Sequence, residues 1–335
     1  MASDAPVSIA SWKFYVHGHY LESDVNGLYK RIMELGDEES HSTVIHDSVI
    51  ARTKMTVDEA LDLEPQSLDA MDNFCLTALQ WAVLRNNAHS TRTILSWNPK
   101  LELCDYDGRT ALHRAAEFGL MDCAGMLLDA GANINSRDAR GEIPLYLATT
   151  LPDTSMLALL LGKGNAAVIA NRYGRTATHG SVFGRFPDDE SALRRIVELL
   201  QTADASIEAR DLDGMSPLVV AVQQSHVAMF RTLRSRGAVI DGLKPCAKQR
   251  TVFHIAAMFS TMDMIQTLSD ERIAQIDPDV KDETGLTATD YLMGRVTLSQ
   301  SELSEGQQQA ANDEVEPFLA LMTETRDEYY DALDL

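Results

Sequence analysis

Cysteine is scarce in this sequence of 335 residues, which contains four: Cys75, Cys104, Cys123 and Cys246. None belongs to a CxxC pair, and no nearby histidine has a spacing that suggests zinc. We therefore expect reduced thiols that mostly pack among apolar neighbours, as in a protein of a reducing compartment. The pattern excludes a disulfide-stapled scaffold.

Basic residues are also in deficit, because 29 Lys and Arg face 50 Asp and Glu and the formal net charge is −21. Such an acidic chain is repelled by nucleic-acid phosphates and anionic lipid. The sequence has no apolar run approaching the roughly 18–20 residues that span a bilayer, and its first residues show no secretory signal pattern. We expect no direct nucleic-acid binding, no membrane insertion, and a monomer in the cytoplasm or nucleus.

Catalytic patterns are missing as well. Gly162-Lys-Gly164 fits neither a phosphate-binding loop nor a dinucleotide fingerprint, and His17-Gly-His19 has no convincing third metal ligand. No nucleophile is paired with a base. We expect no enzyme activity, no cofactor and no metal. An enzyme hidden in residues 1–66, or arising from an insertion within the repeats, stays open as an alternative, which a pocket lined by groups with strongly shifted pKa values would support.

What the sequence does contain is a period. A four-residue phrase recurs, and its starts are separated by 33, 33, 33, 40, 35 and 36 residues. The phrase starts at Thr77, Thr110, Ile143, Thr176, Ser216, Thr251 and Thr287. A glycine stands two residues before five of these starts, at Gly108, Gly141, Gly174, Gly214 and Gly285. Three residues before each glycine is Asp or Asn, at Asp105, Asp138, Asn171, Asp211 and Asp282. A small residue follows five residues into six phrases, at Ala82, Ala115, Ala148, Ser181, Ala221 and Ala256.

Each column of this repeat has a physical reason. Thr or Ser can cap a helix by accepting a hydrogen bond from a backbone N–H. Glycine permits the positive φ of a tight turn, and Asp or Asn can bond its own nearby backbone. A small residue allows a second, antiparallel helix to approach closely. One such unit cannot bury its apolar face alone, so neighbouring units must stack.

The pattern resembles the ankyrin repeat, most clearly where Thr110-Ala-Leu-His-Arg-Ala-Ala is followed by Leu127-Leu-Asp-Ala-Gly-Ala-Asn. The resemblance covers roughly Leu68 to Arg295. It implies an all-α solenoid of about seven stacked helix-turn-helix units with short hairpin-like loops. It also implies that His113, His179 and His254, at the fourth position of the phrase, support the turn.

The regions outside the repeats lead to three predicted parts: residues 1–66 as an N-terminal helical cap, 67–295 as the repeat domain, and 296–335 as a polar loop with an acidic helix or tail. Thr43-Val-Ile-His46 lies 34 residues before Thr77, so a decayed repeat within residues 40–66 also stays open. The spacing of 40 residues after Thr176 predicts about seven inserted residues near Phe186-Pro-Asp-Asp-Glu190.

Smaller elements are predicted within the two end segments. Ser23 can begin a helix that ends at Gly36, and Thr56-Val-Asp-Glu59 is a capping-box pattern that opens a helix toward Leu63. Pro317 suits the first turn of a last helix. We expect the polar stretch 297–309 to be a loop and the acidic residues 327–334 to be a solvated tail.

The loops next to the glycines are the candidate binding surface, because the resemblance implies that partners bind on the loop tips and first helices. The second to fourth repeats place there Tyr106, Arg109, Arg140, Arg172, Tyr173 and Arg175. Tyr and Arg are enriched in binding hot spots, so we expect a partner protein segment that is acidic or phosphorylated. Solvated arginines without a partner are the competing interpretation. The predicted function is a non-catalytic scaffold or adaptor, and the alternative is a coregulator that binds a transcription factor.

Overall fold

A computed structural model describes residues 42–164, 167–184, 189–240, 246–271, 277, 279–294 and 315–333. The chain divides into two units, Met1–Ser42 and Thr43–Leu335, and the helices described here belong to the second. The helix predicted after Ser23, the predicted loop 297–309 and the possible metal pair at His17 and His19 lie outside the described residues.

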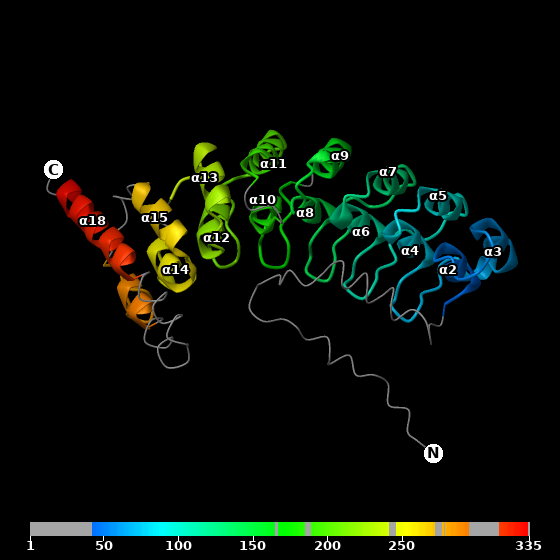
Figure 1. Cartoon of the computed structure of the whole chain (residues 1–335), viewed down its shortest axis with the longest axis horizontal. Helices are drawn as coiled ribbons and strands as arrows, with labels where there is room; N and C mark the ends of the chain where they lie inside the picture. The colour runs from blue at the N-terminus through cyan, green and yellow to red at the C-terminus, as the bar shows by residue number, and fades with distance from the viewer. Residues whose placement is uncertain are drawn as a thin grey trace, which may run out of the picture. The chain divides into compact units, whose positions relative to one another are not determined.

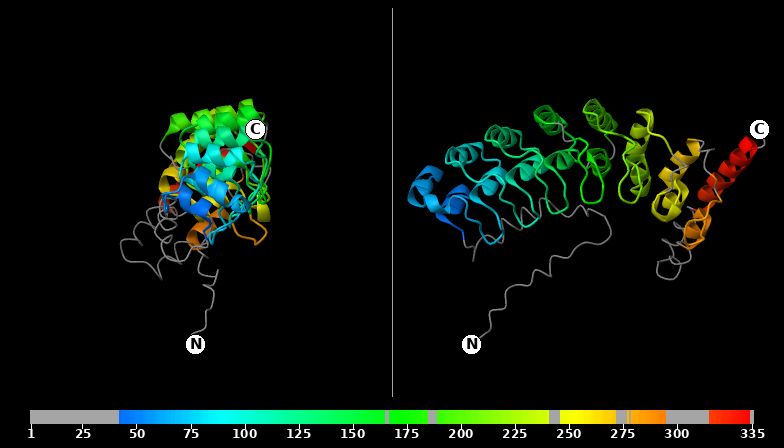
Figure 2. Two further views of the ribbon diagram at one scale, coloured as in Figure 1. Left: turned by 90° about the vertical axis from the view of Figure 1, so that its right-hand side faces the viewer. Right: turned by 180° about the vertical axis from the view of Figure 1, so that it is seen from behind.

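The second unit is built of consecutive helix pairs, which form two rows (Figures 1 and 2). The first helices of the pairs are α2 (Val44–Val49), α4 (Ala78–Leu84), α6 (Ala111–Phe118), α8 (Pro144–Ala148), α10 (Ala177–Gly180), α12 (Pro217–Gln223) and α14 (Val252–Phe259). The second helices are α3 (Val57–Leu63), α5 (Ala88–Ser96), α7 (Met121–Asp129), α9 (Ser155–Lys163), α11 (Glu190–Thr202), α13 (Val227–Ser235) and α15 (Met262–Asp270). Each first helix from α4 to α12 packs on the first helices before and after it. This is the predicted all-α solenoid.

Short 3-10 helices occur beside three of the connections, at Pro65–Ser67 (η3), Ser181–Phe183 (η4) and Ala247–Gln249 (η5). The predicted small residues lie between the rows, since Ala82, Ala115 and Ala256 are fully buried. Leucines of the second helices complete this core, and Leu127 and Leu157 are fully buried too. The core is therefore continuous along the stack, as the sequence columns predict.

The turn before each pair also follows the prediction. Thr77 and Thr110 stand at N-caps with extended backbone, and the side chain of each accepts a hydrogen bond from the third helical N–H. Gly108 has φ of 74°. A Cβ atom added at Gly108 would lie 2.6 Å from the backbone nitrogen of Ala139 in the next turn, so glycine is required there for space as well as for φ.

Residues 43–63 form a helix pair of the same build. Thr43 caps α2 in a capping box with His46, as Thr110 does with His113 in α6. Thr56 and Glu59 form the predicted capping box at the start of α3. Because α2 packs on α4 and α3 packs on α5, this pair extends both rows toward the N-terminus.

The insertion is placed differently from the prediction. Asp189, the N-cap of α11, stands 13 positions after Thr176, whereas Leu120, the N-cap of α7, stands 10 positions after Thr110. The helices themselves also differ, because α11 has 13 residues and α7 has 9. The connection therefore holds only part of the extra length. One further helical turn holds the rest, and the prediction of a loop insertion alone is wrong.

The C-terminal end of the array is formed by two helical segments that are separated in the sequence. Residues 288–294 are helical and contain the buried Leu292, which replaces the small residue of the other units. The partner of α15 on its outer side is α18 (Val315–Leu333), which includes Pro317 in its first turn as predicted. Phe318 is fully buried, and Leu321 and Met322 are nearly so. The helix continues to Leu333, so the expected acidic tail is helical through that residue.

Candidate functional site

Most of the hairpin turns between helix pairs, here called tips, are organised by one carboxylate or amide side chain, although the turn Cys246–Arg250 before α14 has a cysteine at the corresponding position. Oδ1 of Asp105 accepts hydrogen bonds from the backbone N–H of Asp107 (2.9 Å) and Arg109 (3.0 Å). Oδ1 of Asn171 accepts from the N–H of Tyr173 (2.9 Å) and Arg175 (3.0 Å) in the same way. These bonds fix the turn and hold the intervening residues outward.

The tips are also bonded to one another. The N–H of Ala139 donates to the carbonyl oxygen of Asp107, and the N–H of Arg172 donates to that of Arg140, both at 2.9 Å. The N–H of Leu212 donates to the carbonyl oxygen of Tyr173, again at 2.9 Å. Residues from neighbouring repeats therefore lie side by side along the row of tips.

The arginine before the helix cap reaches the next tip. Nε of Arg109 donates to Oδ2 of Asp138 at 3.3 Å. The same relation joins Arg175 to Asp211 at 3.1 Å and Arg250 to Asp282 at 3.3 Å. The arginines at this position thus link consecutive repeats.

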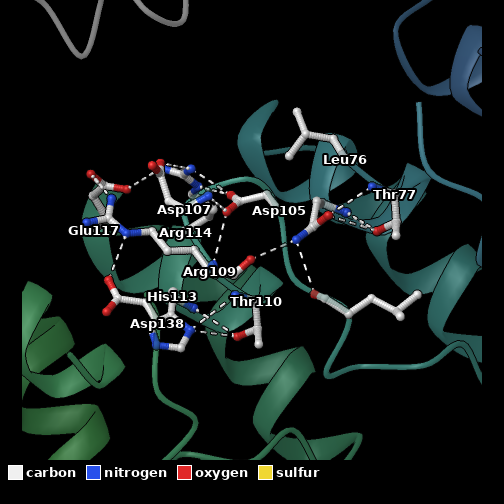
Figure 3. A network of polar contacts seen from close by, with 12 residues as sticks. Leu76, Thr77, Asp105, Asp107, Arg109, Thr110, His113, Arg114, Glu117 and Asp138 are labelled. Atoms are coloured by element: carbon white, nitrogen blue, oxygen red, sulfur yellow. Dashed lines mark hydrogen bonds and ion pairs between the residues drawn. The ribbon is translucent and has the colours of Figure 1, made fainter. Parts of the chain in front are cut away.

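The second and third repeats share a buried ionic network around Arg109 and Arg114 (Figure 3). Arg109 contacts Glu117 at 2.7 Å, and Arg114 contacts Glu117 at 2.9 Å and Asp105 at 2.6 Å. Burial opposes ionisation of Glu117, but the two guanidinium groups outweigh burial and lower the pKa of this carboxyl. The network therefore holds charged groups that compensate one another.

Arg109 does not occupy the exposed position that the sequence suggested. Only 5% of the residue is exposed, because its guanidinium lies between Glu117 and Asp138. The expectation that Arg109 belongs to a solvent-facing basic strip is corrected by this burial. Arg175 is intermediate, with 23% of its side chain exposed and its Nε bonded to Asp211.

The other predicted residues lie at the tips. Tyr106 is 65% exposed and Tyr173 is 55% exposed, while Arg172 is exposed and Arg140 is half-buried. The structure brings Arg140, Arg172 and Tyr173 together and leaves Tyr106 one tip away. The predicted set omits Leu212, which is 77% exposed beside Tyr173. Leu212 follows Asp211 and precedes Gly214, which both belong to the repeat pattern, and this place in the turn was the available signal of its exposure.

The histidines of the phrase join each repeat to the next, as the resemblance implied. Nδ1 of His113 accepts from the N–H of Thr110 at 3.2 Å, and its Nε2 bonds the carbonyl oxygen of Glu142 at 3.1 Å. Because Nδ1 accepts, Nε2 must carry the proton, and the ring is neutral. The pKa is lowered chiefly by burial in His113 and in its counterparts His46, His179 and His254.

Glu142 occupies the position of Arg109 in the following repeat. The residue that faces its carboxyl group also differs from that of the neighbouring repeats. Its carboxyl is hydrogen-bonded to Asn171, which stands where the neighbouring tips have Asp. One oxygen, Oε2, is buried without a hydrogen-bond partner. Burial, followed by the charge of Asp138, raises the pKa of this carboxyl.

The described residues offer little for catalysis. No group of three or more His, Cys, Asp or Glu side chains among them is arranged to hold a metal ion. None of the helices described combines the length and apolar character that crossing a membrane requires. Cys75 and Cys104 are exposed, Cys123 and Cys246 are buried, and none of the four forms a disulfide. Burial raises the pKa of the Cys246 thiol to about 11.

Comparison with known proteins identifies the family of the matched repeats. A sequence model described as "Ankyrin repeats (3 copies)" matches residues 46–138, which begin inside α2 and end at the tip aspartate Asp138. These units are ankyrin repeats. Ankyrin repeats are protein-interaction modules, so the exposed tips are the candidate binding surface.

Relatives and a solved structure agree with this assignment. Human transient receptor potential cation channel subfamily A member 1 is 29% identical over 168 residues, which are 49% of this chain and 15% of that protein. Human B-cell lymphoma 3 protein is 32% identical over 145 residues, which are 42% of this chain and 31% of that protein. The crystal structure of the ankyrin repeat domain of Bcl-3, a unique member of the IkappaB protein family, matches with a TM-score of 0.54 and 25% identity.

That comparison covers 65% of this chain and 95% of the Bcl-3 domain. The matched curated proteins are much longer than the matched part, since the chain spans 15% of the channel and 13% of mouse Rabankyrin-5. The likeness therefore concerns the ankyrin array alone.

Proposed function

We propose that this chain is a non-catalytic scaffold or adaptor that binds protein partners on its ankyrin tips. The observation that carries the proposal is the contrast between the first helices and the tips. The side chains of α8 are all buried, whereas Tyr106, Tyr173 and Leu212 are more than half exposed at the tips. A stiff array of this kind presents its surface with little ordering cost on binding.

The proposed contact residues are Tyr106, Arg140, Arg172, Tyr173 and Arg175. Arg109 is omitted because its burial assigns it a structural role. The proposed partner is an acidic or phosphorylated protein segment, because cationic side chains at one surface of a chain with net charge −21 favour an anionic ligand. We further propose that the chain acts as a monomer in the cytoplasm or nucleus.

The test is affinity purification from cells followed by mass spectrometry, using wild type and the double variant Arg140→Glu/Arg172→Glu. A matched control is Arg194→Glu/Arg195→Glu, which makes the same charge change on exposed positions of α11. Partners of the tips should be lost only from the first variant. Identical partner sets for all three proteins would refute binding at the tips. Equal unfolding midpoints of the variants would show that the loss is not caused by unfolding.

A second function is favoured by the likeness to the Bcl-3 domain. Under this alternative the chain is a coregulator that binds a transcription factor through the same tips, without contacting DNA itself. Nuclear accumulation together with co-purification of a DNA-binding protein supports it. Purely cytosolic partners favour the scaffold.

A further inference from the structure

Two neighbouring tips near the middle of the array bring exposed apolar side chains together. The N–H of Leu212 donates to the carbonyl oxygen of Tyr173 at 2.9 Å, so the two residues lie side by side. Leu212 is 77% exposed and Tyr173 is 55% exposed. Single apolar residues on a surface are common, but adjoining large ones are typical of binding sites, and tyrosine is enriched in binding hot spots. We call Tyr173 and Leu212 the apolar patch.

The ring of Tyr173 is held in place by an arginine. The guanidinium carbon of Arg175 lies over two rings, 6.0 Å from the ring centre of Tyr173 and 5.4 Å from that of Phe183. Nε of Arg175 also donates to Oδ2 of Asp211 at 3.1 Å. Because Oδ1 of Asp211 accepts the backbone bonds of the turn that carries Leu212, one carboxylate joins both halves of the apolar patch. A surface fixed in this way loses little conformational entropy when a partner binds.

The side of the apolar patch toward the preceding tip is cationic. The stem of Arg172, which is exposed, lies against Gly141, where an added Cβ atom would be 2.9 Å from its Cγ. Nη1 of Arg137 would lie 3.5 Å from the same atom, and it donates to the carbonyl oxygens of Gly141 and Ala170. Neither arginine has a carboxylate as an ion-pair partner among the described residues. Two uncompensated positive charges therefore stand beside the apolar patch.

The charges around the apolar patch indicate where acidic groups of a ligand can lie. The charge of Arg175 is compensated by Asp211, so it contributes little attraction. Asp213 follows Leu212 and is exposed, so it repels an acidic group on its own side. The complementary position for an acidic group is next to Arg172, on the other side of the apolar patch.

We propose that the apolar patch anchors a short segment of a partner protein that has one large apolar side chain with Asp or Glu residues beside it. The apolar side chain lies on Tyr173 and Leu212. The acidic residues lie over Arg137 and Arg172. Hydrophobic contact provides the anchor, and charge complementarity sets the position of the segment and disfavours other partners. This proposal rests on the proposed function and specifies which tips carry it and what they bind.

The test is a selection of random dodecapeptides displayed on phage, with the full chain as bait. The variant Tyr173→Ala/Leu212→Ala is used for counter-selection. Peptides that only the wild type enriches should share a large apolar residue with Asp or Glu near it. Enrichment of the same peptides by both proteins, or no enrichment by either, would overturn the proposal. Wild-type-specific peptides that lack acidic residues would overturn it as well.

A selected peptide then serves as the probe in fluorescence anisotropy. Leu212→Ala should weaken its binding about tenfold or more, as expected for an anchor position. The matched control is Val239→Ala, which shortens another aliphatic side chain that is 54% exposed, and it should change binding by less than about twofold. Equal effects of the two substitutions would contradict an anchoring role for Leu212.

A charge exchange tests the acidic half of the segment. Arg172→Glu should weaken binding several-fold, and Arg194→Glu on α11 should not. Replacing the acidic residues of the peptide by Lys should restore binding to the Arg172→Glu variant while weakening binding to the wild type. Such a rescue requires a folded variant, so it separates a direct contact from unfolding. Absence of the rescue would refute the contact with Arg172.

Failure here is distinguishable from failure of the proposed function. If the Arg140→Glu/Arg172→Glu variant loses cellular partners while no selected peptide depends on the apolar patch, the tips bind proteins by another chemistry. If the variant keeps all partners, the proposed function itself fails.

Discussion

His113 in one ankyrin repeat bonds the carbonyl oxygen of Glu142 in the next, with 3.1 Å between Nε2 and the oxygen. The repeat that starts at Thr77 shows that the imidazole is replaceable by an amide. There Gln80 accepts from the N–H of Thr77 at 2.8 Å and donates to the carbonyl oxygen of Arg109 at 2.9 Å. In these two repeats the position supplies one acceptor and one donor in fixed directions, and a neutral ring meets both requirements.

Acid should therefore destabilise the array before its carboxylates titrate. The pKa of His46, His113, His179 and His254 is lowered in the folded chain, so the unfolded chain takes up these protons first as the pH falls. Their contribution to stability is complete above the unfolded value of about 6.5 and is lost as the pH falls below it toward the folded values. Urea unfolding at pH 7.5 and 5.5 measures the loss.

The variant His113→Gln is the matched control for this prediction. Because Gln80 makes the same two bonds, the variant should keep most of its stability at pH 7.5 and lose less than wild type at pH 5.5. An equal loss in both proteins would show that His113 does not contribute to the acid response.

Breaking the buried network at Arg109 should be costly. Arg109→Ala leaves Glu117 and Asp138 with fewer compensating donors in a buried setting, and we expect a loss of about 3–5 kcal/mol in the free energy of unfolding. Lys163→Ala removes an exposed ion pair with Asp129 and should cost less than about 1 kcal/mol. Chemical denaturation compares the two, and similar small losses would contradict the structural role given to Arg109.

Two glycine substitutions should have opposite signs. At Gly180 an added Cβ would lie 2.7 Å from Oγ1 of Thr149, which is itself bonded to the backbone of Tyr146, so Gly180→Ala should destabilise by about 1–3 kcal/mol. Gly125, inside α7, has no neighbour within 4 Å of such an atom. Gly125→Ala should stabilise by about 0.5–1 kcal/mol, since glycine is a poor helix former. Thermal unfolding monitored by circular dichroism gives both signs.

The repeated sequence positions predicted the helix caps and turns within each repeat. They were less informative about the side-chain contacts between repeats. Thr110 and Gly108 act locally, so their residue types indicate their conformations. The burial of Arg109 depends on Asp138, 29 residues away, and on Glu117. Its position directly before the helix cap, which Arg175 and Arg250 share, was a signal that could have indicated this role.

The insertion was placed only in part for a similar reason. Spacing counts the extra residues but does not say whether they lengthen a loop or a helix. Asp189 decides the matter, because its side chain accepts from the N–H of Ser191 and Ala192 and thereby begins α11. An Asp followed by Glu and a helix-favouring run was the local indication that a turn of helix had been added.

Removing the carboxyl charge of Glu142 should stabilise the array at neutral pH. Burial and Asp138 raise the pKa of this carboxyl, so its contribution to stability is present below the unfolded value and is lost as the pH rises through the folded value. Glu142→Gln keeps the shape without the charge, and we expect a gain of about 1 kcal/mol at pH 7. The gain should shrink at pH 4.5, and a gain independent of pH would contradict this account.

Destabilising the C-terminal helix α18 should leave the rest of the array folded. Phe318 is fully buried where α18 meets α15, so Phe318→Ala should cost about 3–5 kcal/mol locally. In a solenoid each unit contacts only its neighbours, and the loss should therefore stay at that end. Hydrogen exchange should become faster in α15 and α18 but stay unchanged in α6. Leu319→Ala, at a position 38% exposed on the same helix, is the control and should change little. Faster exchange in α6 would mean that the array unfolds as one cooperative unit.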